Sequence, residues 1–247
     1  MNRFLNSPKI GIGLQSRIHS QRLPGKALLP LGSALVLNQV MRRLKHLIAS
    51  HFGLLTDHQS ASQFLPIAQK EGFDCIVGDP EDVLDRYYRF SKAYGLDLVI
   101  RATGDNPLVF VSYVPEFIDH LIQLPTLPDY ATMRGLPYGA GLEFVAAKAL
   151  ETAWTNATSP YHREHVCPYL YEHPEDFHLY VVDAPNHLRG ADIRITLDTQ
   201  EDYLFLQQLF HHSQIEVPGT DHLVVQYARE IIQSVPIMEG RINESSN

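Results

Sequence analysis

Three cationic side chains lie close together near the start of the chain, where they could bind a group that carries several negative charges. They are Arg17, Arg22 and Lys26, and a Pro-Gly pair stands directly before Lys26. Arginine forms paired hydrogen bonds with phosphate, and lysine supplies a mobile point charge. The chain has a formal net charge of −8, so these cations do not belong to a generally basic surface. We therefore expect a small polyanion such as a nucleoside triphosphate to bind here, and not a nucleic acid.

A solvated turn with dispensable cations is the alternative interpretation of this loop. The loop follows the apolar run 10–14 and precedes an amphipathic segment, so it joins a strand to a helix, where backbone amides also favour anions. Two nearby glycine motifs do not match known phosphate loops. Gly11-Ile12-Gly13 lacks a third glycine and is interpreted as a close-packing device, and Gly25-Lys26 does not complete a Walker A loop.

Two aspartates follow apolar runs farther along the chain. Asp105 comes after the run 97–101, and Asp198 comes directly after Ile-Thr-Leu. Mg²⁺ needs only one or two protein carboxylates when phosphate oxygens and water complete its shell. Asp105 could instead form only an Asx turn, and Asp198 could simply precede a helix that Thr199 caps. Their pairing at a magnesium site follows from the predicted topology and not from their spacing.

The first half of the chain alternates strand-like and helical patterns, which predicts how these residues are positioned. A mostly parallel α/β sheet covered by helices is the expected fold, and ligands bind such sheets at the carboxyl ends of the strands. The predicted strands are 9–14, 53–56, 74–77 and 97–101. The predicted helix starts are Ser33, Pro66 and Asp79 with Pro80, and the last of these helices ends near Gly95.

The second half of the chain is less regular. We expect a turn-rich segment at 125–141 and a helix at 146–156, and a second helix begins at Ser159-Pro160. Two strands at 179–183 and 193–197 and the closing helices follow. With 247 residues and 45% hydrophobic content, the chain predicts one domain over 8–238, with an inserted acceptor and dimerisation region at about 126–190 and a polar tail at 239–247.

Composition excludes several classes of protein. No apolar run approaches the roughly 18 residues of a membrane span, and the N-terminus lacks a signal-peptide pattern, so we expect a cytoplasmic protein without membrane insertion. Cys75 and Cys167 are the only cysteines and lack metal-ligand spacing, which indicates reduced thiols.

The order of the motifs resembles the cytidylyltransferase family that includes spore-coat polysaccharide biosynthesis protein F and the 3-deoxy-manno-octulosonate and acylneuraminate cytidylyltransferases. The resemblance runs from Ile10 to about Leu209, and its motifs are Gln15-Ser16-Arg17, Arg22–Lys26, Gly78–Tyr88, Thr103–Leu108, Arg163–Val166 and Arg194–Thr199. It implies a Rossmann-like nucleotidyltransferase fold with a small β-rich extension used for dimer contact, and hence a homodimer. It also implies Mg²⁺-dependent transfer of CMP from CTP to an acceptor hydroxyl, with release of pyrophosphate.

The resemblance also implies roles for individual residues. Arg17, Lys26 and Asp105 would be catalytic, and Asp105 and Asp198 would hold Mg²⁺. The nucleotide-binding set would be Leu14, Gln15, Ser16, Arg17, Arg22, Lys26, Thr103, Gly104 and Asp105. The candidates that line the pocket of the sugar acceptor are Arg134, Tyr138, Glu143, His162, Arg163 and Arg194.

The acceptor region departs from the family pattern, because Tyr138 and Gly141 replace two acids. An acidic sugar of the surface-polysaccharide or nonulosonate type is the expected acceptor. Cytidylyl or guanylyl transfer to a phosphonate or polyol phosphate stays open, as does an inactive homologue that only binds nucleotide sugars.

Overall fold

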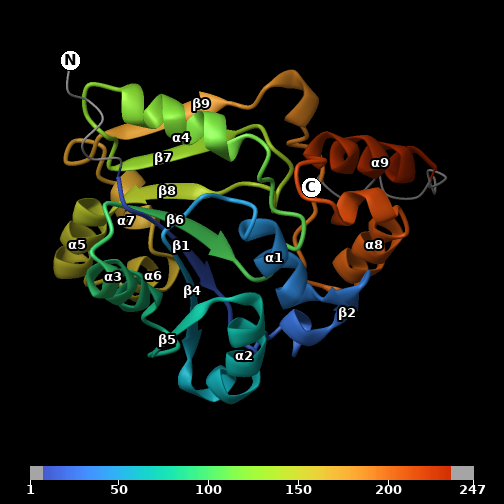
Figure 1. Ribbon diagram of the computed structural model, residues 1–247, viewed down its shortest axis with the longest axis horizontal. Coiled ribbons are helices and arrows are strands. Elements are labelled where there is room, and N and C mark those ends of the chain that lie inside the picture. Colours follow the sequence, from blue (N-terminus) through green and yellow to red (C-terminus); the bar gives the residue numbers. More distant parts are fainter. Residues whose placement is uncertain (1–7, 235–247) are drawn as a thin grey trace, which may run out of the picture.

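Seven strands form one mixed sheet through the middle of the molecule (Figure 1), in a computed structural model that describes residues 8–234. The strand order is β5-β4-β1-β6-β8-β7-β9; the first four strands are parallel, β8 is antiparallel to both neighbours, and β9 is parallel to β7. The strands are β1 (Ile10–Gln15), β4 (His51–Asp57), β5 (Asp74–Gly78), β6 (Leu98–Thr103), β7 (Tyr130–Arg134), β8 (Glu143–Ala146) and β9 (Leu179–Asp183). A separate ribbon pairs β2 (Pro30–Leu31) with β3 (Ala34–Leu35).

Helices cover both faces of this sheet (Figure 1). One apolar cluster contains side chains of α1, α2, α4, α8 and α9, and a second contains side chains of α3, α5 and α7. The fold class predicted from the sequence is therefore confirmed. The helices are α1 (Val36–Leu44), α2 (His58–Glu71), α3 (Val83–Tyr94), α4 (Val114–Gln123), α5 (Ala147–Asn156), α6 (Pro160–His165), α7 (Pro168–Tyr171), α8 (Gln200–Phe210) and α9 (Asp221–Ser234), with 3₁₀ turns η1 (Lys26–Leu28), η2 (Asn186–Leu188) and η3 (Ser213–Glu216).

The glycines of β1 let helix α3 pack directly on the sheet. A Cβ at Gly13 would lie 2.5 Å from the Tyr87 ring, and one at Gly11 would lie 2.2 Å from the Leu96 side chain. The Tyr87 hydroxyl reaches past β1 and bonds the carbonyls of Gly13 and Ala102. The Gly-Ile-Gly motif therefore serves close packing, as the sequence predicted, and holds β1 and β6 in place beside the site.

Three predicted helix starts are wrong. Ser33 does not cap α1, because its amide and hydroxyl bond the Glu216 carboxylate instead. α2 begins at His58 with Asp57 as its N-cap, so Pro66 lies inside this helix. α3 begins at Val83, because Asp82 and not Asp79 accepts the capping bond from an amide of the first turn.

The second half of the chain differs from the prediction at three places, one of which is β8, a strand that was not predicted. The segment 125–141 contains β7, and Ile193–Leu197 is extended but forms only one isolated bridge, between Tyr138 and Arg194. The predicted β-rich segment 126–190 adds β7, β8 and β9 to the main sheet. The strand at 179–183 and the helices at 146–156 and 160 onward are confirmed to within one residue. The predicted tail 239–247 lies outside the described residues.

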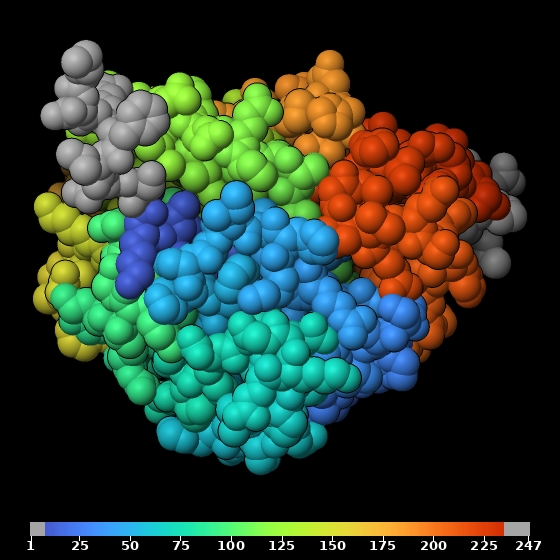
Figure 2. Space-filling view, in the orientation of Figure 1, coloured from blue at the N-terminus to red at the C-terminus, as the bar shows by residue number. Residues whose placement is uncertain are grey.

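The C-terminal helices return to the N-terminal part of the chain. Figure 2 shows α8 and α9, in orange and red, against the blue segment that includes β2 and α1. The Tyr203 hydroxyl donates to the Pro30 carbonyl at this contact, and Arg43 of α1 forms a buried ion pair with Asp221 of α9. This return brings the segment before α8 to the carboxyl ends of β1 and β6.

Within residues 8–234, no helix has both the length and the apolar character needed to cross a membrane.

Candidate active site

A cleft of about 990 Å³ opens at the carboxyl ends of β1 and β6. Its walls come from segments that are far apart in the chain. They are the loop after β1, the turn after β6, the loop between β7 and β8, the end of α6 and the segment before α8. This is the edge of the sheet at which the sequence predicted a site.

One ammonium group joins the two predicted metal-binding carboxylates. The Lys26 Nζ atom lies 3.0 Å from Asp105 Oδ2 and 2.9 Å from Asp198 Oδ1, and it donates a third bond of 2.8 Å to the Leu197 carbonyl. The Lys26 side chain is 13% exposed. The predicted convergence of the N-terminal cations with the two aspartates is therefore observed.

Asp198 also contacts two arginines. Arg22 Nη2 lies 3.0 Å from Asp198 Oδ1, and Arg194 Nη2 lies 2.7 Å from Asp198 Oδ2. Burial raises the pKa of Asp198, but the hydrogen bonds and charges of Lys26, Arg194 and Arg22 outweigh it and hold this pKa below its ordinary value. Asp198 is therefore a carboxylate at neutral pH.

The start of α8 holds Asp198 in place. Thr199 and Asp202 form a capping box, in which the Thr199 hydroxyl accepts from the Asp202 amide and the Asp202 carboxylate accepts from the Thr199 amide. The same carboxylate accepts from the Asp198 amide at 2.8 Å and pairs with Arg194 at 2.8 Å. The predicted capping role of Thr199 is thus confirmed, and it coexists with the position of Asp198 in the site.

The cationic loop is fixed through the capping network of α2. Asp57 accepts from the Gln59 and Ser60 amides and from the Ser60 hydroxyl, and that hydroxyl accepts from the Ile18 amide at 2.8 Å. Gly25 has a φ of 70°, a left-handed conformation that glycine adopts without strain, and its amide bonds the Ile18 carbonyl. Arg17 projects from this loop to Glu164, at 3.0 Å.

A close approach joins the loop after β1 to the turn after β6. A Cβ at Gly104 would lie 2.5 Å from the Ser16 hydroxyl oxygen, and the Gly104 amide donates to the Gln15 carbonyl at 2.8 Å. Position 104 therefore requires glycine so that Asp105 can reach Lys26.

The carboxylate pair fits a divalent cation of the Mg²⁺ type. Within residues 8–234, no group of three or more His, Cys, Asp or Glu side chains is arranged to hold a metal alone. Two carboxylates that face one cationic atom would nevertheless suffice as the protein share of a Mg²⁺ shell if phosphate oxygens and water completed it.

Arg86 lines the cleft and was missed by the sequence analysis. Its residue is 2% exposed, its Nε atom has no hydrogen-bond partner, and no carboxylate of residues 8–234 forms an ion pair with it. Its one hydrogen bond goes from Nη1 to the Leu55 carbonyl, at 3.3 Å. Burial lowers the pKa of Arg86. Asp57 and Asp82 attract this charge from beyond ion-pair distance, and no acid contacts it directly. A guanidinium of this kind in the wall of the cleft makes Arg86 a candidate ligand contact.

A part-buried ion pair forms the other end of the cleft. Arg101 pairs with Glu143 and donates from Nε to Gln15 Oε1 at 3.1 Å, and the Tyr130 hydroxyl donates to Glu143 at 2.8 Å. Because arginine has only donors, this bond fixes the Gln15 oxygen toward Arg101 and leaves its amide hydrogens for other partners. Arg101 and Tyr130 were also missed by the sequence analysis.

The predicted acceptor residues fall into two groups. Arg134, Tyr138 and Glu143 line the cleft, and the Tyr138 ring, at 62% exposed, lies 4.9 Å from the Arg194 guanidinium. The other predicted residues do not line it. Arg163 is bound to Asp82 and to the Trp154 carbonyl, His162 bonds Glu172, and Arg194 pairs with Asp198 and Asp202. Leu14, which was predicted to bind the nucleotide, is fully buried in the core and does not line the cleft.

The cleft is instead reached by the neighbours of these α6 residues, Glu164 and His165. The next residue, Val166, has a φ of 71°, a strained conformation for a β-branched side chain. Its turn is closed by a 2.9 Å bond from the Cys167 amide to the His165 carbonyl. The turn directs His165 toward the cleft and Cys167 into the core, where burial raises the pKa of the thiol.

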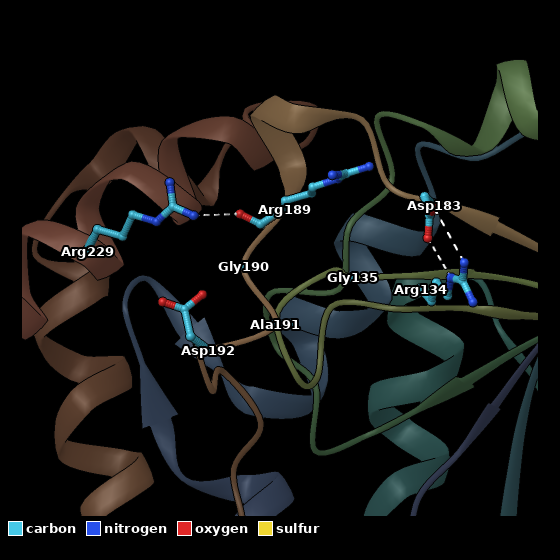
Figure 3. Close-up of a pocket in the computed structure, with 8 residues that line it drawn as sticks. All are labelled: Arg134, Gly135, Asp183, Arg189, Gly190, Ala191, Asp192 and Arg229. Atoms are coloured by element: carbon cyan, nitrogen blue, oxygen red, sulfur yellow. Dashed lines mark hydrogen bonds and ion pairs between the residues drawn. The ribbon is translucent and has the colours of Figure 1, made fainter.

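A second, smaller pocket of about 280 Å³ adjoins the acceptor end of the cleft (Figure 3). Arg134 and Gly135 line both cavities. The other residues that line the small pocket are Asp183, Arg189, Gly190, Ala191, Asp192 and Arg229.

Comparison with known proteins places these features in a family. A family model described as cytidylyltransferase matches residues 12–231. An uncharacterized protein of Methanocaldococcus jannaschii is 35% identical over 84% of this chain and 86% of its own length, and the spore coat polysaccharide biosynthesis protein SpsF of Bacillus subtilis is 32% identical over 80% and 84%. The solved structure of a cytidylyltransferase from Leptospira borgpetersenii has a TM-score of 0.82 at 30% identity and covers 92% of this chain and 98% of its own.

Proposed function

The chain belongs to the cytidylyltransferase family, and from this premise we propose that it transfers CMP from CTP to a hydroxyl group of a sugar and releases pyrophosphate. The observation that carries the proposal is the contact of Lys26 with both Asp105 and Asp198. In this reaction the acceptor oxygen attacks the α-phosphorus, a new P–O bond forms, and the bond to the pyrophosphate oxygen breaks. The protein has mainly to position the reactants and to neutralise charge.

The N-terminal loop supplies the charge neutralisation. Arg17, Arg22 and Lys26 would bind the triphosphate, and Asp105 with Asp198 would hold Mg²⁺, which neutralises phosphate charge when it is bound. The Lys26 ammonium lies between the two carboxylates, so it must leave them when a divalent cation binds there. Released from these aspartates, it is free to contact the phosphates as a point charge.

Two donors of the cleft match the base of CTP. Cytosine presents two neighbouring acceptors, N3 and O2, on its pairing edge. Arg86 lines the cleft with a guanidinium that forms no ion pair within residues 8–234, and Gln15 offers the amide hydrogens that its bond to Arg101 leaves free. Uracil carries a donor at N3, so these groups favour cytosine over uracil.

The acceptor would bind at the end of the cleft that Arg134, Tyr138 and Glu143 line. An exposed tyrosine suits the apolar face of a sugar ring, and arginine suits a carboxylate. An acidic sugar is therefore the acceptor that we propose. We also propose a homodimer that forms through the segment 126–190, which light scattering after size-exclusion chromatography would test.

The test is to incubate the purified protein with Mg²⁺ and each of the four nucleoside triphosphates in turn, with a panel of acidic and neutral sugars, and to measure pyrophosphate. We expect pyrophosphate from CTP and an acidic sugar, with the CMP-linked product identified by mass spectrometry. Release from GTP would support the guanylyl alternative. Tight CTP binding without pyrophosphate from any acceptor would contradict transfer and would support an inactive binding protein.

A further inference from the structure

The small pocket beside the acceptor end of the cleft carries an excess of positive charge. Three arginines and two aspartates line it, and Arg134 of β7 is already paired with Asp183 of β9 (Figure 3). Arg189 and Arg229 remain, and neither forms an ion pair with a carboxylate of residues 8–234. Against these two cations the pocket offers one further acid, Asp192.

Main-chain bonds hold the two unpaired guanidinium groups near the pocket. Arg189 donates from Nε to the Ala184 carbonyl at 2.7 Å, and Arg229 donates from Nη2 to the Arg189 carbonyl at 3.0 Å. A guanidinium has five N–H donors, so most of the donors of each group stay free for a ligand. Because these bonds restrict the side chains, less rotamer freedom is lost when a ligand binds.

The backbone of the pocket adds further donors. Across the part of the chain that the structure describes, the amides of Gly135, Ala191 and Asp192 form no hydrogen bond with a protein acceptor. The Gly190 amide bonds the Gly135 carbonyl at 2.9 Å and joins the two walls. Guanidinium groups beside free amides are the donor set that proteins use for oxyanions.

We propose that this pocket binds an oxyanion group of the acceptor, either a phosphate or a carboxylate. This group lies at the opposite end of the acceptor from the hydroxyl that receives CMP. The pocket shares Arg134 and Gly135 with the cleft, so the two cavities lie side by side, and one molecule bound in the cleft would place a remote group in the pocket. Its volume of about 280 Å³ suits one such group with its nearest carbon atoms. The acceptor would then be a sugar or polyol acid with an anionic group at its far end. This inference rests on the proposed transfer reaction for the identity of the ligand, but the pocket can be tested separately.

The binding test uses inorganic phosphate as the probe and ¹⁵N-labelled full-length protein with saturating CTP, which keeps phosphate out of the triphosphate site. We expect the amide resonances of Gly135 and Gly190 to shift along a saturable curve. In an Arg189→Gln/Arg229→Gln double variant the dissociation constant for phosphate should rise at least about tenfold, since bonds to charged groups are involved, while that for CTP stays within about twofold. The matched control is Arg89→Gln, because Arg89 is another exposed arginine that donates to a main-chain carbonyl. Shifts that do not saturate, or that are equal in the double variant and the wild type, would overturn the proposal.

The kinetic test separates phosphate from carboxylate and separates this inference from the proposed function. Acceptors are compared in pairs that differ only in a remote phosphate or carboxylate, and the double variant should lose the KM advantage of the preferred anion while kcat is kept. Saturable shifts of the Gly135 and Gly190 resonances without turnover of any acceptor would support the oxyanion pocket and refute the transfer reaction. Turnover of an acceptor by a wild-type protein whose Gly135 and Gly190 resonances do not shift with phosphate would refute the oxyanion pocket but not the transfer reaction.

Discussion

The ammonium nitrogen of Lys26 lies 2.9 Å from a carboxylate oxygen of Asp198, although 172 positions separate the two residues in the chain. The contact is nearly shielded from water, with side-chain exposures of 13% and 11%. It joins the loop after β1 to the segment before α8 and completes the charge cluster of the cleft. Several consequences can be measured.

Replacement of Lys26 should strengthen metal binding while it weakens nucleotide binding. In the Lys26→Met variant the two carboxylates lose the cation that competes with a metal ion, so we expect the dissociation constant for Mn²⁺ alone, measured by electron paramagnetic resonance, to fall at least about threefold. The affinity for CTP should fall, because a phosphate contact is lost. Lys92→Met, which removes an exposed lysine paired with Glu151, is the control. Weaker Mn²⁺ binding in the Lys26 variant would mean that the lysine does not occupy the metal position.

Asp105→Ala should nearly abolish turnover and leave the fold intact. We expect kcat to fall by at least about a hundredfold, because each ~1.4 kcal/mol of lost transition-state stabilisation is a factor of about ten. The carboxylate is part-exposed, and the bond from the Leu197 amide goes to the Asp105 main-chain carbonyl, which alanine keeps. Circular dichroism checks that the variant is folded, and steady-state pyrophosphate release measures its turnover. Retained activity, or an unfolded variant, would count against a metal role.

Two buried arginines should respond in different ways to replacement by methionine. Arg43→Met leaves the carboxylate of Asp221 buried without its cation, so we expect a loss of about 3–5 kcal/mol in the free energy of unfolding. Arg86→Met removes a buried charge that Asp57 and Asp82 attract only from beyond ion-pair distance, so stability should be nearly kept. CTP affinity should nevertheless fall at least about tenfold in the Arg86 variant. Urea unfolding measures the free energy of unfolding, and calorimetric titration measures the affinity for CTP. Equal destabilisation by both variants would refute the different roles of the two arginines.

The stability that Asp198 contributes should depend on pH below about 5. The pKa of Asp198 is held below its ordinary value, so the folded state binds its proton less readily than the unfolded chain. The ionised carboxylate therefore stabilises the fold fully above the ordinary aspartate pKa of about 3.9, and this contribution is lost as the pH falls through the lowered pKa.

Urea titrations of the wild type and of Asp198→Asn across this range provide the measurement. The difference between their free energies of unfolding should be largest near neutral pH and should shrink from about pH 5 downward. A difference that is constant with pH, or that grows in acid, would contradict the lowered pKa.

Gly104→Ala should destabilise the protein by about 1–3 kcal/mol, because the new methyl group overlaps the Ser16 side chain. Gly141→Ala is a matched control in the same cleft, since a Cβ there would meet no atom within 4 Å. We expect the control to stay within about 0.5 kcal/mol of the wild type. Thermal unfolding measures both, and a Ser16→Gly replacement added to Gly104→Ala should restore part of the loss.

The sequence allowed most of the sheet and the charge cluster to be predicted from local patterns, but it did not predict β7 or β8. The apolar runs located β1, β4, β5, β6 and β9, and the rule that ligands bind at the carboxyl ends of parallel strands placed Lys26 near Asp105. The roles of these residues in binding CTP and Mg²⁺ stay predictions. The segment 193–197 is predicted to be a strand, but in the structure it forms only one isolated bridge.

Arg86 was missed because a charged residue on a helix is ordinarily exposed to solvent. A signal was nevertheless present, since Arg86 falls three positions after Val83 and four before Phe90, on the buried face of α3. His162 and Arg163 were chosen from their motif alone. In the structure His165 reaches the cleft, and His162 and Arg163 do not, because of the strained turn at Val166. Side-chain types do not predict this turn, since it depends on tertiary packing.

The origin of the cleft from both ends of the chain has a consequence for biosynthesis. When a ribosome has made the first 190 residues, the cationic loop and Asp105 have left it, but Arg194 and Asp198 have not. At that stage all seven strands of the main sheet have been made, but Arg22 lacks its partner Asp198 and Lys26 can pair only with Asp105. The charge cluster around Lys26 is therefore completed only when the segment 194–198 is in place.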